Sequence, residues 1–178
     1  MTRTIGKILT PAFCLISIIA YCVSSQNKTN FQEVNFQATD TLYFDTSKTA
    51  IIPLLRKSNY PFDNSYRAAS LNQQDITNID SLLIISVVDF NNSLSEDSQR
   101  WSIDLKENNY RKQLVVAMNN KGEKEVWVNC FCDSFYKYWR NTWKSEIVMV
   151  MDGAQCYFQF KINLTTKKVY EFRVNSTA

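Results

Sequence analysis

Three cysteines in the C-terminal part of the chain are the residues whose type and spacing most directly suggest chemistry. Cys130 and Cys132 are two positions apart, and Cys156 follows later in another apolar stretch. Thiolates act as nucleophiles, redox centres and metal ligands, and thiols in an oxidising compartment form disulfides. Two cysteines spaced this way in one strand point to the same face but are badly placed to bond each other. We therefore expect Cys156 to bond Cys132 or Cys130.

Cys132 is the preferred partner because it ends its predicted strand, where the backbone adjusts more easily. A closed loop of about 24 residues would stabilise the fold by roughly 3 kcal/mol in the chain-entropy estimate. Two alternatives stay open: three buried free thiols, or a redox or metal-binding role. The cysteine pair and the one distant cysteine lack a good fourth zinc ligand. We expect no metal, no cofactor and a disulfide that serves stability.

Composition excludes several classes of catalytic site. The 178 residues include no histidine, which removes every histidine-dependent triad, zinc site and general base. Only three glycines are present, and they form no phosphate loop or dinucleotide fingerprint. Carboxylates such as Asp75, Asp80, Asp133 and Asp152 fall on predicted helix starts and turns, where capping explains them. We predict no catalytic residues and lean against an enzyme.

Aromatic residues gather between positions 135 and 143, where the spacing favours a short helix. Aromatic side chains are frequent in binding patches, but more often they close the end of a core. The core interpretation is preferred for most of this cluster. Tyr136 and Trp143 lie off the main apolar stripe, and they are the candidates for a surface that binds another molecule.

The N-terminus has the pattern of an export signal. Arg3 and Lys7 precede an uncharged run at residues 8–21, which has the length of a signal-peptide core and is short for a spanning helix. Small residues at positions 23–25 favour cleavage that releases a chain beginning at Gln26. Lipidation of Cys22 is a second processing outcome, although the bulky Tyr21 before it is unusual at that position. An uncleaved membrane anchor is the third outcome. The predicted location is the bacterial cell envelope: periplasmic, secreted or lipid-anchored.

Charge and composition define the mature part of the chain. Loss of Arg3 and Lys7 with a signal peptide at residues 1–25 leaves 18 basic and 17 acidic residues. Such a neutral protein has no electrostatic footprint for nucleic acid, and only a lipid on Cys22 would hold it to a membrane. Residues 26–40 are polar and read as a flexible lead-in. Residues 41–178 are the right length for a single domain.

Alternating apolar residues predict strands in the second half of the chain. Both faces of residues 126–132 are largely apolar, which indicates a central strand. Residues 156–162 and 170–174 alternate more simply, and we expect Tyr170, Phe172 and Val174 to share a face. A hairpin is predicted between residues 111–118 and 125–131, with a glycine in its turn. Earlier, residues 50–55 are expected to form an edge strand, because Pro53 cannot donate to a ladder.

One long helix is predicted at residues 71–88, continuing toward Phe90. Asn72 can cap it, and Asp75 falls in its first turn. Apolar residues cover nearly the whole circumference of its second half, so we expect deep burial against a sheet that wraps it. With a strand before the helix and five strands after it, interrupted once by a short helix, the predicted class is α+β. In detail, one long helix would pack on a curled antiparallel sheet.

The segment VWVNCFC at residues 126–132, followed by Trp139, the Asp152–Gly153 turn and the segments at 156–158 and 161–164, resembles a group of small exported bacterial proteins of unknown function. The resemblance covers residues 71–178. Ala154 stands where those proteins often have a second glycine. The order of helix and meander is also similar to cystatin-like architectures, at the level of fold alone.

Three classes of function remain. The preferred one is a non-catalytic module, an inhibitor or accessory subunit, that binds another envelope or extracellular protein. A small-ligand binder with a pocket between helix and sheet is the alternative. An enzyme that uses cysteine or carboxylate groups comes last. A flat apolar surface would favour the first class, and a well-formed cavity would favour the second.

Overall fold

The computed structural model describes residues 45, 47–55 and 60–176. They lie in one compact unit, Thr39–Ala178. The expected signal peptide, the lead-in and Cys22 all lie outside the described residues. The strands and helices, in chain order, are β1 (Thr49–Ile51), β2 (Arg67–Ala68), α1 (Gln73–Ser93), β3 (Arg111–Met118), β4 (Lys124–Phe131), α2 (Tyr136–Trp139), β5 (Tyr157–Asn163) and β6 (Lys168–Val174).

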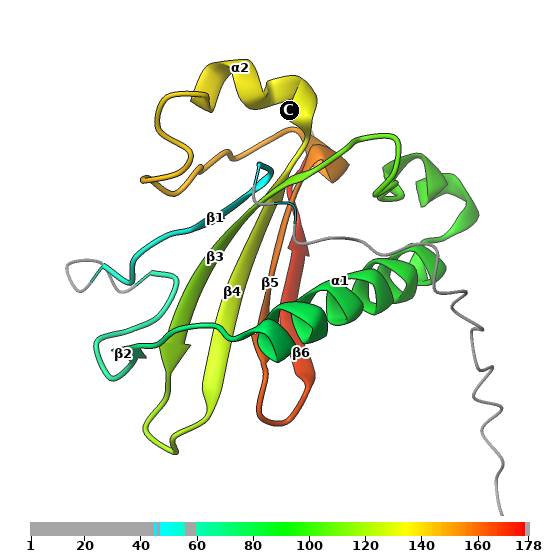
Figure 1. The fold of residues 1–178 in the computed structure, drawn as a ribbon. Helices are drawn as coiled ribbons and strands as arrows, with labels where there is room; N and C mark the ends of the chain where they lie inside the picture. Colours follow the sequence, from blue (N-terminus) through cyan, green and yellow to red (C-terminus); the bar gives the residue numbers. More distant parts are fainter. Residues whose placement is uncertain (1–44, 46, 56–59, 177–178) are drawn as a thin grey trace, which may run out of the picture. The chain divides into compact units, whose positions relative to one another are not determined.

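The strands form a six-stranded mixed sheet in the order β1-β3-β4-β5-β6, with β2 also paired to β3. β3 to β6 are an antiparallel meander (Figure 1), whereas β1 runs parallel to β3. The α+β class is therefore correct, but a purely antiparallel sheet is not. The chain between β1 and β3 includes α1, and a crossover of this length permits parallel pairing. The predicted hairpin joins β3 to β4, and Gly122 has the positive φ of 78° that its turn requires.

Four strands, not five, follow α1 among the described residues. The stretch at residues 101–105 begins at the end of a 3₁₀ helix (Glu96–Trp101) and continues into a turn. Asn91 explains this geometry, because its side chain donates to Ile103 O and accepts from Ile103 N, at 2.9 and 2.8 Å. The side chain of Asn91 therefore satisfies both the N–H and the C=O of Ile103, which would otherwise need a neighbouring strand.

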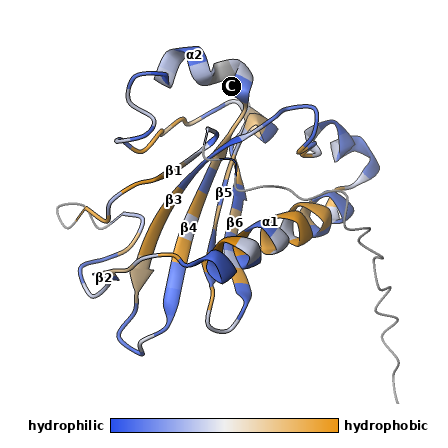
Figure 2. Ribbon diagram, viewed as in Figure 1, coloured by the Kyte–Doolittle hydropathy of each residue, from blue (hydrophilic) through white to orange (hydrophobic). Residues whose placement is uncertain are grey.

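α1 begins with the predicted cap. Asn72 Oδ1 accepts from Asp75 N, and Asp75 Oδ2 accepts from Asn72 N, each at 2.9 Å. Its inner face buries Ile79, Leu83 and Val87 against the sheet. The expected burial of nearly the whole circumference is wrong, because Ile85 is 51% and Val88 48% exposed. The sheet covers one side of the helix only, and apolar residues remain on its outer side (Figure 2).

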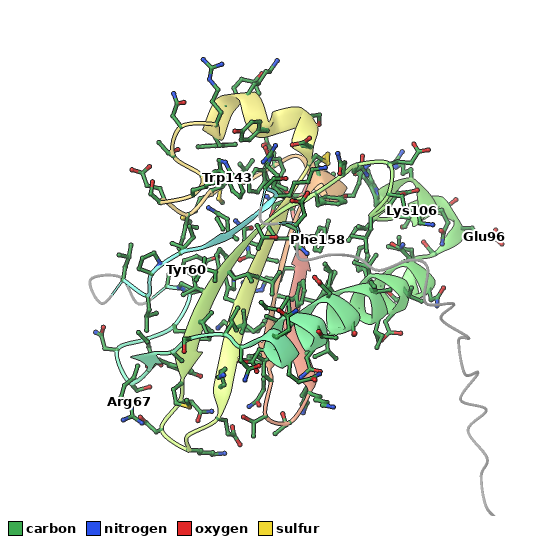
Figure 3. The ribbon with its side chains drawn as sticks, viewed as in Figure 1. Tyr60, Arg67, Glu96, Lys106, Trp143 and Phe158 are labelled. Atoms are coloured by element: carbon green, nitrogen blue, oxygen red, sulfur yellow. A yellow bond between two sulfur atoms is a disulfide. The ribbon has the colours of Figure 1, made fainter. Side chains whose placement is uncertain are left out.

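Each face of the sheet has its own apolar cluster, and β4 contributes to both. We call the side covered by α1 the helix face, where Val126, Val128 and Cys130 of β4 are buried. The opposite side, covered by loops and α2, is the loop face, where Trp127 and Phe131 are buried. β4 pairs with β3 and β5, so the prediction of a central strand with both faces covered is confirmed. Phe158 lies on the helix face, and Tyr60 and Trp143 lie on the other side (Figure 3).

β6 departs from simple alternation. The register shifts opposite residues 159–161 of β5, and Glu171 has a φ of 53°. Such a bulge inserts one residue and changes the face of the side chains beyond it. Phe172 packs on the helix face, whereas Tyr170 donates to Glu125 on the loop face. The prediction that Tyr170, Phe172 and Val174 share a face is therefore wrong for Tyr170.

Candidate binding site

The loop face carries a segment, residues 147–151, that is attached to the sheet by side-chain amides. Gln113 Nε2 donates to the carbonyl oxygens of Trp143 and Glu146, at 2.5 and 2.6 Å. Gln113 Oε1 accepts from Val148 N at 2.8 Å, and Asn129 Nδ2 donates to Val148 O at 2.9 Å. These two amides from β3 and β4 satisfy backbone groups of a chain that joins no strand. One end of the segment is thereby fixed over the sheet.

The residues after β6 hold the other end of the segment. Asn175 Nδ2 donates to the carbonyl oxygens of Val150 and Asp152, at 2.6 and 3.0 Å. With the backbone fixed at both ends, two large apolar side chains of the segment remain exposed. Met149 is 64% and Met151 86% exposed, and these are unusual values for a large apolar residue.

A pocket of 330 Å³ lies beside the two methionines, over β4, β5 and the end of β6. Trp127 Nε1 and the Tyr60 hydroxyl both donate to Gln159 Oε1, at 2.9 and 2.5 Å. The rings of Tyr60 and Trp127 meet edge to face, with centroids 5.4 Å apart. Because these polar groups already satisfy one another, the rings offer mostly apolar surface to a ligand.

Arg173 is the single charged residue among the described residues that line the pocket. It forms no ion pair with any part of the chain that the structure describes. Its neighbour Glu171 is paired with Lys161 at 3.1 Å. Burial raises the pKa of Tyr60, while its hydrogen bond with Gln159 and the charge of Arg173 oppose that rise. The pocket therefore combines an apolar lining with one available cation.

The described cysteines do not line this pocket, and two of them form the predicted bond. Cys132 and Cys156 form a disulfide, with their Cα atoms 4.9 Å apart. Cys132 N also donates to Cys156 O at 2.9 Å, which places the two residues side by side beyond the β4–β5 ladder. Cys130 is a free, buried thiol, and burial raises its pKa to about 12 although Lys112 opposes the shift. Such a thiol is a poor nucleophile and metal ligand at neutral pH.

Trp143 does not lie on the surface, so that prediction is wrong. It is 1% exposed and packs edge to face against Phe131, with ring centroids 6.1 Å apart. Tyr136 is half-buried, and the guanidinium of Arg111 lies 3.5 Å above its ring. The two aromatic candidates therefore form part of the loop-face core, and they do not line the pocket.

A second polar cluster lies at the β3–β4 turn. Glu125 is buried and accepts from Tyr66, Tyr170 and Asn119. Burial, then the Glu125 charge, raises the pKa of Tyr66 to about 12. Glu123 also accepts from Asn119, and this hydrogen bond comes first among the causes that lower the Glu123 pKa. Amide and hydroxyl donors hold both carboxylates as acceptors, and the lowered pKa of Glu123 is the opposite of what a general acid needs.

Sequence reasoning missed Met149, Met151, Tyr60 and Arg173, which surround the pocket. The available signal was two amides, at positions 113 and 129, inside strands that are otherwise strongly apolar. A buried amide needs partners, and here its partners are the backbone groups of residues 143–148.

Comparison with protein-family models, curated proteins and solved structures gave no match for this chain. Within the described residues, no cluster of three or more His, Cys, Asp or Glu side chains is placed to hold a metal ion. A search of the same residues found no helix with the length and apolar character needed to cross a membrane.

Proposed function

We propose that this is an exported, non-catalytic protein of the cell envelope that binds another protein as an inhibitor or accessory module. The observation that carries the proposal is the pair of exposed methionines, Met149 and Met151, on a fixed backbone beside an aromatic pocket. The unbranched thioether side chain of methionine adapts to different partners, and Met, Tyr, Trp and Arg are enriched at interfaces.

Fixed backbone around the pocket supports a binding role. Ordering a loop on association costs free energy, and a loop that is already ordered avoids much of that cost. Gln113 and Asn129 hold one end of residues 147–151, and Asn175 holds the other. The side chains that stay free to adapt are the two methionines, so a rigid frame carries an adaptable contact surface.

We also propose the finer architecture: one long helix on a curled antiparallel meander. It is supported by the apolar cluster that α1 shares with β3, β4 and β5. Export is supported by the apolar run at residues 8–21 and by the Cys132–Cys156 disulfide, since such bonds persist in oxidising compartments. Intact-mass measurement of exported protein should give a chain beginning at Gln26, or at a lipidated Cys22. Recovery of the uncleaved chain would contradict this.

Selection from a library of displayed linear peptides tests the binding role. The purified protein should enrich related peptides that no longer bind the double variant Met149→Ser/Met151→Ser. Ile85→Ser/Val88→Ser is the matched control, because it removes two exposed apolar residues from the outer side of α1 and should leave binding unchanged. Peptides that bind both variants equally, or no enrichment at all, would contradict the proposed site.

A small-ligand binder is the second candidate. A shallow hollow of 350 Å³ lies between α1 and β6, lined by Phe90, Phe172 and polar residues that include Asp89. Titration with an anilinonaphthalene sulfonate dye tests this hollow. Under this alternative, dye fluorescence rises with the wild type and is lost in Ser93→Trp, which narrows the hollow. Dye binding that instead depends on Met149 and Met151 would reject it.

A further inference from the structure

We infer that the pocket recognises a peptide segment in which a large apolar side chain stands next to an acidic residue, whose carboxylate pairs with Arg173. This inference rests on the proposed function, because it names the class of partner that the same pocket would take. Two features of the pocket lining carry it: its apolar residues and its single charged residue among those described, Arg173.

The apolar part is formed by the rings of Tyr60 and Trp127 and the thioethers of Met149 and Met151. The whole pocket, including its polar lining, has a volume of 330 Å³, which is near the lower end of about 300–1,000 Å³ for ligand pockets. A space of this size suits a side chain presented by a peptide better than a large cofactor. The donors of Tyr60 and Trp127 are already used on Gln159, so the cavity favours an aliphatic or aromatic group.

The cationic part is Arg173, which lies directly across from Gln159 in the β5–β6 pairing and therefore on the loop face. Lys161 already pairs with Glu171, the nearest acidic residue along the strand, so the strand itself leaves the Arg173 charge uncompensated. A guanidinium matches a carboxylate through two parallel hydrogen bonds. The charge of the pocket lining thus selects an anionic partner group.

The carboxylate could belong to an acidic side chain or to the C-terminus of a peptide, and we propose the acidic side chain. Proteins commonly hold a peptide's terminal carboxylate in a nest of backbone N–H groups. Here the cation is the single side chain of Arg173, the one charged residue among the described residues that line the pocket, and it is no nest of backbone N–H groups.

The test uses peptides enriched on the wild-type protein and resynthesised with an amidated C-terminus. The inference expects their consensus to place Asp or Glu beside an apolar residue. Replacing that acidic residue by its amide should weaken binding about tenfold or more, as expected for loss of a charge-assisted hydrogen bond. Arg173→Glu should lose the acidic peptide by a similar factor and gain affinity for a version carrying Lys. Arg140→Glu, an exposed arginine outside the pocket, makes the same change in net charge and should have no such effect.

The possible failures are distinguishable. Peptides that need Met149 and Met151 but show no acidic preference, and bind Arg173→Glu normally, would overturn the inference and leave the proposed function standing. If peptides bind only when their terminal carboxylate is free, the inference that Arg173 pairs with an acidic side chain would be overturned. Failure to enrich any peptide that depends on the methionines would overturn the inference and the proposed function together.

Discussion

The two faces of the sheet are covered in different ways. On the helix face, α1 and the strands meet mainly through apolar side chains, among them Ile79, Leu83 and Val87 of the helix. On the loop face, residues 143–151 are held by specific hydrogen bonds from Gln113, Asn129 and Asn175. Apolar contact has no direction and spreads over a surface, whereas a hydrogen bond fixes the chain at one point. The loop face can therefore leave a pocket between its points of attachment.

One ion pair interrupts the apolar helix face. Lys112 of β3 donates to Asp80 of α1 at 2.8 Å, and both residues are buried. A buried pair often adds little net stability, because both charges lose hydration, but it disfavours arrangements that would separate them. Its position between helix and sheet therefore fixes how α1 lies on β3.

The largest expected effect is on the helix face. Leu83→Asp places a carboxylate in the apolar layer beneath α1, and Lys112, the one buried cation among the described residues, is already paired with Asp80. We expect loss of folding, corresponding to about 4 kcal/mol or more. Far-UV circular dichroism and thermal melting would measure it. Val88→Asp is the control, because Val88 is 48% exposed on the same helix and its change should stay within about 0.5 kcal/mol. Equal melting temperatures for Leu83→Asp and wild type would contradict the core described here.

The sequence predicted the regular parts of this protein well. Alternation in β4 placed Val126 and Val128 on one face and Trp127 on the other, because strand periodicity depends only on local geometry. The cap of α1 followed from the same local logic, through Asn72 and Asp75. The preference for Cys132 over Cys130 as the partner of Cys156 is confirmed, and it depended on Cys132 lying at the end of its strand, where the backbone adjusts more easily.

Features that depend on distant partners were missed. The sequence predicted that Trp143 lies on the surface. In the structure its ring packs against Phe131, and its carbonyl oxygen accepts a hydrogen bond from Gln113. The bulge at Glu171 changed the face of Tyr170, and alternation alone cannot reveal such a shift. The pocket likewise needed Tyr60 and Arg173 to be brought together by tertiary structure.

The hydrogen bonds that hold residues 143–148 on the loop face can be removed without changing the helix face. Gln113→Leu keeps most of the side-chain volume but leaves the carbonyl groups of Trp143 and Glu146 and the N–H of Val148 without their amide partner. Leaving several buried polar groups unsatisfied should cost about 4 kcal/mol or less, depending on how far water enters. Urea unfolding would measure the loss, and hydrogen exchange should quicken at residues 147–150 more than in α1.

A matched control for this variant is Gln74→Leu, an exposed glutamine on α1, which should change stability by less than about 0.5 kcal/mol. Uniformly faster exchange in α1 and in residues 147–150 would mean that the two faces are not held independently.

The smallest of the three expected losses of stability follows from removing the Cys132–Cys156 disulfide. Cys156 packs against both apolar clusters, so loss of the disulfide in Cys132→Ser/Cys156→Ser should destabilise both faces together. The chain-entropy estimate for its 24-residue separation is about 3 kcal/mol. Urea unfolding followed by circular dichroism and by tryptophan fluorescence should give one shared, lower midpoint, whereas separated midpoints would show that the bond stabilises one face only.

Peptide mapping without reduction checks the bond itself and supplies the control. The fragments that contain Cys132 and Cys156 should stay linked, and Cys130 should react with alkylating reagent only after denaturation. Burial explains this inertness, because it raises the Cys130 pKa to about 12, so almost no thiolate exists at neutral pH in the folded protein. Fast alkylation of Cys130 in the native protein, or free thiols at all three positions, would contradict a purely structural role for these cysteines.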